Sequence, residues 1–295
     1  MTITRFAPSP TGHLHLGHAF AALTAHDAAR ADGGRFLLRI EDIDRARCRS
    51  TYEDAICEDL AWLGLAWDVP VRRQSEHFAD YVAALDRLGS LGVLYPCFCT
   101  RNAIADEIAR AATAPHGLAS GPAAGSGGPP YPGTCRELAP AIRAKRIGAG
   151  EAYAFRLDVA RAIARAGGEL FFTEGGRGPA GETGRQRATP VLLGDVVLAR
   201  KDMPTSYHLA VVVDDALQGV TLVTRGADLF AATHTQRLLQ ALLDLPVPDY
   251  RHHRLILDER GRKFSKRDRA ATLRDLRARG VSPGDIRRTL GLTSR

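Results

Sequence analysis

Two histidines stand three residues apart in His15-Leu16-Gly17-His18, where a stretch with helical character begins. Backbone N–H groups at a helix N-terminus attract phosphate, and imidazole rings donate hydrogen bonds to phosphate oxygens. Gly17 lets a nucleotide approach the backbone closely. The pair alone could be two surface histidines, but the preceding run from Arg5 to Gly12 favours nucleotide binding. We therefore expect an ATP site that contains Pro8, His15, Gly17 and His18.

A cationic loop near the other end of the chain carries Lys263 and Lys266, again three residues apart. Lysines at this spacing can stabilise the negative charge that develops on a phosphate group during transfer. A basic loop taken alone is more often a solvated or RNA-facing surface, but its pairing with the histidine element favours catalysis. The sequence therefore predicts His15, His18, Lys263 and Lys266 as catalytic residues, with Lys266 also in contact with ATP.

Three of the five cysteines lie in one region, in Cys97-Phe98-Cys99 and at Cys135. In a reducing compartment such a cluster indicates metal binding before disulfides, and three thiolates are good ligands for Zn²⁺. The Cys-x-Cys pair is tighter than the commoner Cys-x-x-Cys pair. The alternative is three buried cysteines that pack as small hydrophobic side chains.

The length and charge of the chain indicate how many domains it has and which kinds of partner it binds. A chain of 295 residues corresponds to about two domains and can bury a sizeable core. The net charge of +7 and the pI of about 9.4 favour polyanionic partners such as ATP and RNA. We see no signal-peptide pattern in the residues after Met1, and no apolar run approaches the roughly 20 residues that span a bilayer. We therefore expect a cytoplasmic protein without a membrane partner.

Short apolar runs alternate with helical stretches, which predicts an α/β fold. The opening strand–helix–strand pattern, from residue 2 to residue 40, is typical of a parallel sheet. The expected strands are 2–6, 36–40, 94–99, 196–199 and 220–223. The expected helices are 16–30, 51–63, 78–91, 234–243 and two short ones within 273–290. The run 210–213 could be a strand or part of a buried helix.

Composition changes sharply between residues 111 and 132, which are rich in Ala, Gly, Pro and Ser, and again in the Gly-rich stretch 175–184. Such segments have too little apolar content to pack. We expect a catalytic domain in two parts, 1–94 and 191–245, separated by an inserted subdomain at 95–190 with the candidate zinc site. Residues 246–295 would hold the lysine loop and a short C-terminal helical segment.

The histidine and lysine elements resemble the HIGH and KMSKS signatures of class I aminoacyl-tRNA synthetases, whose catalytic domain is a Rossmann-type parallel sheet. The stretch from Arg5 to His18, followed by Arg39-Ile40-Glu41-Asp42-Ile43-Asp44-Arg45, resembles the glutamyl-tRNA synthetase family. The likeness covers nearly the whole chain outside the Gly-rich loops. It departs from the family consensus at Phe264 and Arg267, which leaves the two lysines unchanged.

The chain ends at Arg295, where a glutamyl-tRNA synthetase would continue into an anticodon-binding domain. It therefore resembles the truncated paralogues, the glutamyl-Q tRNA(Asp) synthetases. That resemblance implies activation of L-glutamate with ATP and Mg²⁺ to glutamyl-adenylate without tRNA. Glutamate would then pass to the queuosine base at the wobble position in the anticodon arm of tRNA(Asp). We expect a monomer.

Three alternatives remain open at this point. The first is a truncated glutamyl-tRNA synthetase that charges a tRNA 3′ end. The second is a non-catalytic RNA-binding paralogue that kept the fold, although the intact histidines and lysines argue against it. The third is a general nucleotidyltransferase, which leaves no role for the acidic and basic residues discussed next.

An acidic amino acid requires cationic partners, and Arg offers a two-pronged fork to a carboxylate. Arg225 directly follows an expected strand, at the kind of strand end where α/β proteins bind ligands. Glu41 follows another strand and can accept from the substrate ammonium group, assisted by Ser9. Tyr207 resembles the family's substrate-contacting tyrosine. The full expected glutamate-binding set is Arg5, Phe6, Ala7, Pro8, Ser9, Glu41, Tyr207 and Arg225.

Each of these side chains also has an ordinary structural alternative. Glu41 could pair with Arg45 or Arg47, Arg225 could pair with Asp228 at the surface, and Tyr207 could belong to the core. Asp214 and Asp215 are expected at the wall of the ATP cleft.

The family resemblance also extends to the cysteine cluster. It implies a structural zinc tetrahedron whose ligands are Cys97, Cys99, Tyr131 and Cys135. Tyrosine is an unusual zinc ligand, and His116 is the alternative for the fourth position. The long insert before Tyr131 is compatible with the site, because the entropy cost of closing a loop grows slowly with its length.

Overall fold

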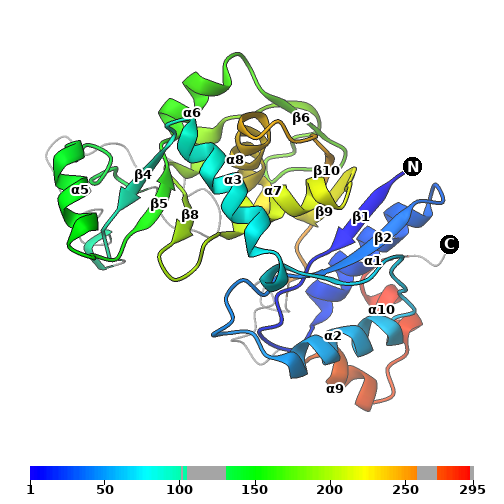
Figure 1. Cartoon of the computed structure of the whole chain (residues 1–295). Helices are drawn as coiled ribbons and strands as arrows, with labels where there is room; N and C mark the ends of the chain where they lie inside the picture. Colours follow the sequence, from blue (N-terminus) through cyan, green and yellow to red (C-terminus); the bar gives the residue numbers. More distant parts are fainter. Residues whose placement is uncertain (101, 105–130, 258–270, 293–295) are drawn as a thin grey trace, which may run out of the picture.

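The fold is α/β, as the sequence predicts, and its main sheet is assembled from distant parts of the chain (Figure 1). The computed structural model describes residues 1–100, 102–104, 131–257 and 271–292. Three early strands pair in parallel: β1 (Ile3–Phe6), β2 (Arg35–Ile40) and β3 (Arg72–Arg73). Three later strands also pair in parallel: β9 (Leu222–Gly226), β10 (Asp249–His253) and β6 (Phe171–Glu174).

The two groups of strands meet where β1 lies beside the start of β9. The Thr221 N–H donates to the Ile3 carbonyl at 3.0 Å, and the Ile3 N–H donates to Thr221 Oγ1 at 2.9 Å. The order is therefore β3–β2–β1–β9–β10–β6, with β7 (Gly184–Arg187) antiparallel to β6. The order reverses between β1 and β9, and open α/β sheets bind ligands at the carboxyl ends beside such a point. Arg5 and Arg225 stand near those ends.

Two apolar cores hold the helices in place. In the first, α1 (Leu16–Arg30) and α2 (Ser50–Trp62) pack with β2. The second contains residues of α3 (Phe78–Ser90), α6 (Val159–Ala166), α7 (Tyr207–Leu217) and α8 (Phe230–Leu242). The ambiguous run 210–213 lies inside α7. Its residues are buried on every side of the helix, which explains why no helical period is visible in the sequence.

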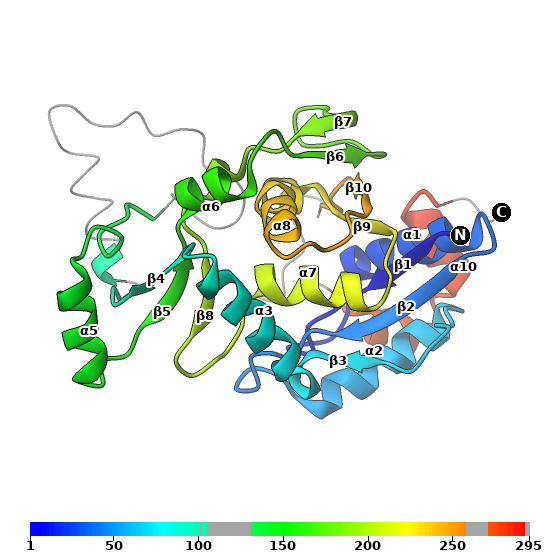
Figure 2. The ribbon, with the colours of Figure 1, turned by 45° about the horizontal axis from the view of Figure 1, so that its top comes forward.

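A smaller antiparallel sheet lies at one end of the molecule in both views (Figures 1 and 2). Its strands are β4 (Leu94–Cys97), β5 (Ala154–Leu157) and β8 (Val197–Arg200). The helix α5 (Pro140–Gly148) lies beside this sheet, and α6 (Val159–Ala166) follows β5. The sheets divide the chain differently from the expected insert at 95–190. Within that range β6 pairs with β10 of the main sheet, whereas β8 lies beyond it and belongs to the smaller sheet.

Two short helices close the described chain, as expected for residues 273–290: α9 (Leu273–Ala278) and α10 (Pro283–Thr289). They bury Leu273 and Ile286 in the same core as α1 and α2. Arg287 of α10 also forms two hydrogen bonds with Asp27 of α1, at 2.7 and 2.9 Å. The last helix of the described chain is therefore packed against α1.

The strand β10 has no counterpart among the expected strands. Its sequence Asp-Tyr-Arg-His-His shows no apolar run, although Tyr250 and His252 are both buried. Among the helices of the described ranges, none combines the length and apolarity that a bilayer-spanning helix requires.

Candidate active site

His15 and His18 form a closed unit at the start of α1. His15 is the N-cap residue, and its Nδ1 accepts a hydrogen bond from the Gly17 N–H at 3.1 Å. The Nδ1 of His18 accepts from the His15 N–H at 3.2 Å, and the ring centroids lie 3.8 Å apart. Because both Nδ1 atoms accept, the neutral rings carry their protons on Nε2, where each can donate. A Cβ on Gly17 would lie 3.0 Å from the His15 ring, so glycine also preserves this geometry.

The chain returns to the histidine element after residues 258–270. Thr272 forms a β-bridge with His15, and the Leu273 N–H donates to the Leu14 carbonyl at 2.8 Å. Lys263 and Lys266 lie outside the described residues, so their catalytic role stays a prediction.

A hollow of about 190 Å³ brings together three of the residues expected to bind the amino acid, Ser9, Glu41 and Tyr207. Ser9 comes after β1, Glu41 comes directly after β2, and Tyr207 begins α7. Thr11 and Gln74 also line the hollow, as do several residues of the segment 43–48. Segments far apart in the sequence thus meet at the carboxyl ends of neighbouring parallel strands.

Arg225 lies beside this hollow, and its Nη1 donates to the Tyr207 hydroxyl at 3.4 Å. The residue is 5% exposed. Its other hydrogen bonds reach Gln236 Oε1, Thr233 Oγ1 and His252 Nε2, at 2.8, 2.7 and 3.2 Å. None of these partners is a carboxylate, so within the described residues the buried guanidinium has no counter-ion. A buried cation without a counter-ion is unfavourable, and a carboxylate ligand would relieve that penalty.

Arg5 is engaged differently, because it already holds a carboxylate. Its Nε and Nη2 donate to Asp215 at 2.9 and 3.3 Å, and its Nη1 donates to the Thr224 carbonyl at 3.3 Å. Asp215 accepts a further hydrogen bond from Arg39 Nη1 at 2.7 Å. Arg39 also reaches Glu41 Oε1 at 3.3 Å. A chain of alternating charges therefore links Arg5 to Glu41 beneath the hollow.

Burial and the neighbouring arginines shift the pKa values of the two carboxyl groups in opposite directions. At Glu41 burial outweighs the attraction of Arg39 and Arg5, so the pKa lies above its usual value. At Asp215 the same two arginines outweigh burial, so the pKa lies below its usual value. Asp215 is therefore the firmly ionised member. Glu41 is the group whose charge a bound ammonium would stabilise most.

The sequence interpretation missed most of this network. Asp214 and Asp215, expected at the wall of the ATP cleft, are instead buried in ion pairs, with exposures of 0% and 6%. Asp214 accepts from Arg72 and Gln74, each at 2.8 Å. The sequence signal that could have revealed this network is Arg39, a charged residue in an apolar strand. Such a charge is almost never fully buried unless it is paired.

The remaining predicted residues act through packing and backbone contacts. Phe6 lies in the core with Leu14. Pro8 is buried, and its carbonyl accepts from the Glu41 N–H at 3.0 Å, which fixes the backbone of that residue. Ala7 is half-buried between them.

The alternative pairings of Glu41 are wrong. Arg45 donates instead to the Ser75 carbonyl at 3.0 Å, and Arg47 pairs with Asp44 at 2.5 Å.

The cysteine cluster forms a candidate metal site. The three sulfur atoms of Cys97, Cys99 and Cys135 lie within 4.8 Å of one another. The Tyr131 hydroxyl lies 3.5 Å from Cys97 Sγ and 3.3 Å from Cys99 Sγ, so a fourth donor faces the same point. Burial raises the pKa of Cys99 to about 11. At Cys97 burial raises the pKa, but hydrogen bonds with Tyr131 and Arg156 outweigh it, so the pKa lies below its usual value. His116 lies outside the described residues.

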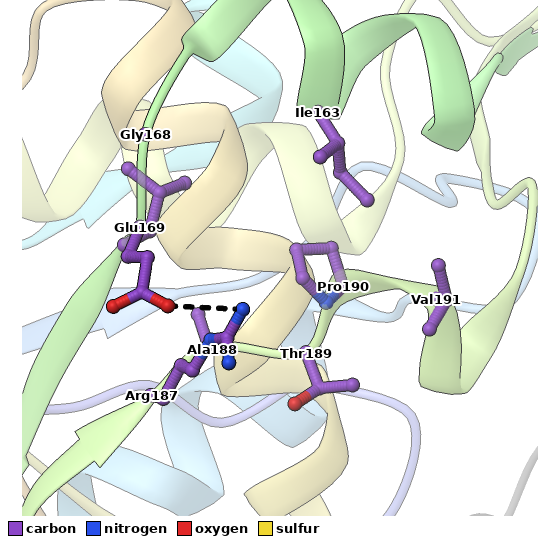
Figure 3. A pocket seen from close by; sticks show the side chains of 9 residues that line it. Ile163, Gly168, Glu169, Arg187, Ala188, Thr189, Pro190 and Val191 are labelled. Carbon is purple, nitrogen blue, oxygen red and sulfur yellow. Dashed lines mark ion pairs between the residues drawn. The ribbon is translucent and has the colours of Figure 1, made fainter.

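Figure 3 shows a second hollow, which has a volume of about 380 Å³ and is lined by none of the predicted site residues. Its lining includes Ile163, Thr189 and Pro190. The ion pair that faces it, Glu169 with Arg187 at 3.1 Å, is exposed on both sides. No residue of the predicted nucleotide or amino-acid sites lines this hollow, so the smaller one is the candidate active site.

Known proteins of one family match almost the full length of this chain. A family model described as "tRNA synthetases class I (E and Q), catalytic domain" matches residues 1–293. The glutamyl-Q tRNA(Asp) synthetase of Rhodobacter capsulatus is 52% identical over 291 residues, which covers 98% of this chain and 100% of that protein. The protein of the same name from Nocardia farcinica is 45% identical, with 96% of this chain and 81% of that protein covered.

The solved structures include a glutamate tRNA ligase from Elizabethkingia meningosepticum in complex with its amino acid. It matches with a TM-score of 0.71 and 27% identity, over 90% of this chain and 52% of that chain. The present chain therefore spans about half the length of that ligase.

Proposed function

Because the chain belongs to the catalytic-domain family of the class I tRNA synthetases for glutamate and glutamine, we propose that it activates L-glutamate with ATP. We propose further that it transfers the glutamyl group to the queuosine base at the wobble position of tRNA(Asp). The observation that carries the first step is the buried Arg225, which has no carboxylate partner among the described residues and lies beside the hollow of Ser9, Glu41 and Tyr207. The names of the relatives from Rhodobacter capsulatus and Nocardia farcinica support the second step.

Glutamate matches the proposed site through its charges. Its ammonium group would bind Glu41 with help from Ser9, and its side-chain carboxylate would bind Arg225 and the Tyr207 hydroxyl. Arg5 and Arg39 would hold Glu41 and Asp215 in place from beneath. Glutamine carries a neutral amide in place of the carboxylate and would leave the Arg225 charge uncompensated, so the site would discriminate against it.

In the activation step, the α-carboxylate of glutamate attacks the α-phosphorus of ATP. An O–P bond forms, the bond to pyrophosphate breaks, and glutamyl-adenylate results. The Nε2–H groups of His15 and His18 would donate to phosphate oxygens at the start of α1, and Lys263 and Lys266 would neutralise the departing pyrophosphate. This mechanism needs no protein nucleophile, since positioning and charge stabilisation carry it. Mg²⁺ would accompany ATP and supply further charge neutralisation.

In the transfer step, a hydroxyl of queuosine attacks the acyl carbon of the adenylate, and AMP leaves. Basic residues of the C-terminal segment and of the smaller-sheet region would contact RNA phosphates.

We also propose a structural Zn²⁺ held by Cys97, Cys99, Cys135 and Tyr131. Three sulfurs and one oxygen facing one point fit a closed tetrahedral site, and thiolates are preferred zinc ligands. The metal would join the end of β4 to the segment that carries Tyr131 and Cys135, and would take no part in the reaction.

Two measurements test the proposed function. ATP–pyrophosphate exchange should depend on glutamate and proceed without tRNA. Labelled glutamate should then be incorporated into tRNA(Asp) that contains queuosine and not into the same tRNA without it. The chain would instead be a glutamyl-tRNA synthetase if ATP–pyrophosphate exchange requires tRNA(Glu). The same conclusion would follow if the labelled glutamate is found on the 3′ end of a tRNA.

A further inference from the structure

Behind Arg225 lies a buried carboxylate–imidazole pair that the proposed reaction does not use. Glu174, at the end of β6, and His252, on β10, are 1% and 2% exposed. Glu174 Oε2 lies 2.5 Å from His252 Nδ1, and Glu174 Oε1 accepts from the His252 N–H at 2.9 Å. The Gly176 N–H donates to the same Oε1 at 2.7 Å. The carboxylate is therefore held by three donors and has one orientation toward the imidazole.

These contacts decide which nitrogen of His252 carries the proton. Because Glu174 accepts at Nδ1, that nitrogen carries the hydrogen, and Nε2 presents its lone pair. Nε2 then accepts from the Arg225 Nε–H at 3.2 Å. A protonated ring would instead direct an N–H at the Arg225 N–H. Burial lowers the pKa of His252 more than the hydrogen bond to Glu174 raises it, which favours the neutral ring.

We infer that Glu174 and His252 are positioning residues that select a carboxylate side chain over its amide. The inference rests on the proposed function. His252 holds Arg225 at Nε, so that its Nη1 stays within reach of Tyr207 at the hollow. A cation held in the binding geometry loses less conformational entropy when the ligand arrives. Release of Nε would weaken binding of a carboxylate, whereas an amide gains little from the cation and would be affected less.

The chain offers a matched control in His234. Like His252 it is a buried histidine, 6% exposed, and its ring contacts the same Phe230 ring. The centroid distances are 5.3 Å for His234 and 5.1 Å for His252. Its Nδ1, however, accepts from the Thr189 N–H at 2.9 Å, and it makes no hydrogen bond to Arg225 among the described residues.

The test is glutamate-dependent ATP–pyrophosphate exchange by the full chain and its variants. His252→Leu should raise the KM for glutamate about tenfold or more, with the KM for ATP unchanged and the preference for glutamate over glutamine reduced. His252→Gln, whose side-chain oxygen can replace Nε2 as acceptor, should stay close to the parent. His234→Leu should leave the KM for glutamate unchanged. The inference is overturned if the two leucine variants behave alike, if the KM for ATP rises equally, or if His252→Gln is as impaired as His252→Leu.

If His252→Leu does not fold, Glu174→Gln provides a second test. This variant keeps the volume of the Glu174 side chain and one oxygen that accepts hydrogen bonds. Nitrogen-15 NMR of the histidines should show one His252 tautomer in the parent protein, protonated at Nδ1, and a mixture in Glu174→Gln. An Nε2-protonated ring or an imidazolium at neutral pH in the parent would refute the positioning role. This readout does not need glutamate activity. Absence of glutamate-dependent exchange by the parent protein would instead refute the proposed function.

Discussion

At the scale of single residues, two buried arginines near the ends of neighbouring strands, Arg5 and Arg225, differ in the charge of their partners. Arg5 forms an ion pair with Asp215, and Arg39 forms ion pairs with both Asp215 and Glu41. Arg225 is surrounded by neutral acceptors. Of the two, Arg225 is therefore the residue that a substrate carboxylate would stabilise most, and Arg5 is the one that supports the floor of the site.

Replacement of Arg225 by Gln should raise the KM for glutamate about 100-fold, because charge-assisted hydrogen bonds to a buried carboxylate are among the strongest in proteins. The KM for ATP should stay within about twofold, since the residues proposed to bind the nucleotide are other ones. Pyrophosphate exchange at varied concentrations of each substrate measures both. Arg251→Gln, on the exposed side of β10, is the control, and equal effects of the two variants would contradict the assignment.

At the scale of elements, α2 buries a carboxyl group that it does not neutralise. Asp59 is 1% exposed, and in the described part of the chain its Oδ2 accepts no hydrogen bond. Burial raises its pKa from the usual 3.8 to about 6. The helix therefore packs most favourably when this group is protonated.

The sign of this shift leads to a pH-dependent prediction. A pKa raised by folding stabilises the protein fully below about pH 3.8, and that contribution is lost as the pH rises through about 6. Asp59→Asn should therefore increase the free energy of unfolding at pH 8 by roughly 1–3 kcal/mol and change it little at pH 4. Urea unfolding at the two pH values measures the difference. An equal gain at both would mean that ionisation is not responsible.

The cysteine cluster would also act between elements, because its residues join the end of β4 to the segment that carries Tyr131 and Cys135. Protein purified without chelator should contain one zinc per chain by mass spectrometry, and Cys135→Ser should lose it. The thermal unfolding temperature of that variant should fall, since a structural metal stabilises the folded state. Cys57→Ser, on α2 and outside the cluster, should retain the metal. Zinc-free parent protein would disprove the zinc assignment.

At the scale of the whole molecule, the fold brings the two ends of the described chain together. The bridge between Thr272 and His15 sets the C-terminal helices against the histidine element at the start of α1. The chain as a whole carries a net charge of +7, which suits a polyanionic partner.

This charge predicts different salt dependences for the two proposed steps. Transfer of glutamate to tRNA should weaken by tenfold or more between about 50 and 200 mM salt, because phosphate contacts release counterions on binding. Pyrophosphate exchange without tRNA should change far less, since it does not depend on contacts with the many phosphates of a tRNA. Initial rates over a salt series measure both steps. Parallel losses in the two would contradict binding of the tRNA through its phosphates.

Local sequence determined what depends on neighbouring residues. The helix 16–30 occurs with those bounds, and two short helices lie within the range 273–290 that was expected to hold them. The strand β10 could not be predicted, because its burial comes from partners far away in the chain rather than from an apolar pattern.

The same division runs through the site. Residue types and spacing, together with the family resemblance, marked Arg225, Glu41, the histidines and the cysteines as residues able to do chemistry. Only the tertiary structure decided that, within the ranges it describes, Arg5 is paired with a carboxylate whereas Arg225 is not, and that His252 and Glu174 lie behind Arg225. The physical reason is that charge compensation in a buried site depends on distances between side chains from different strands. Sequence spacing does not encode those distances.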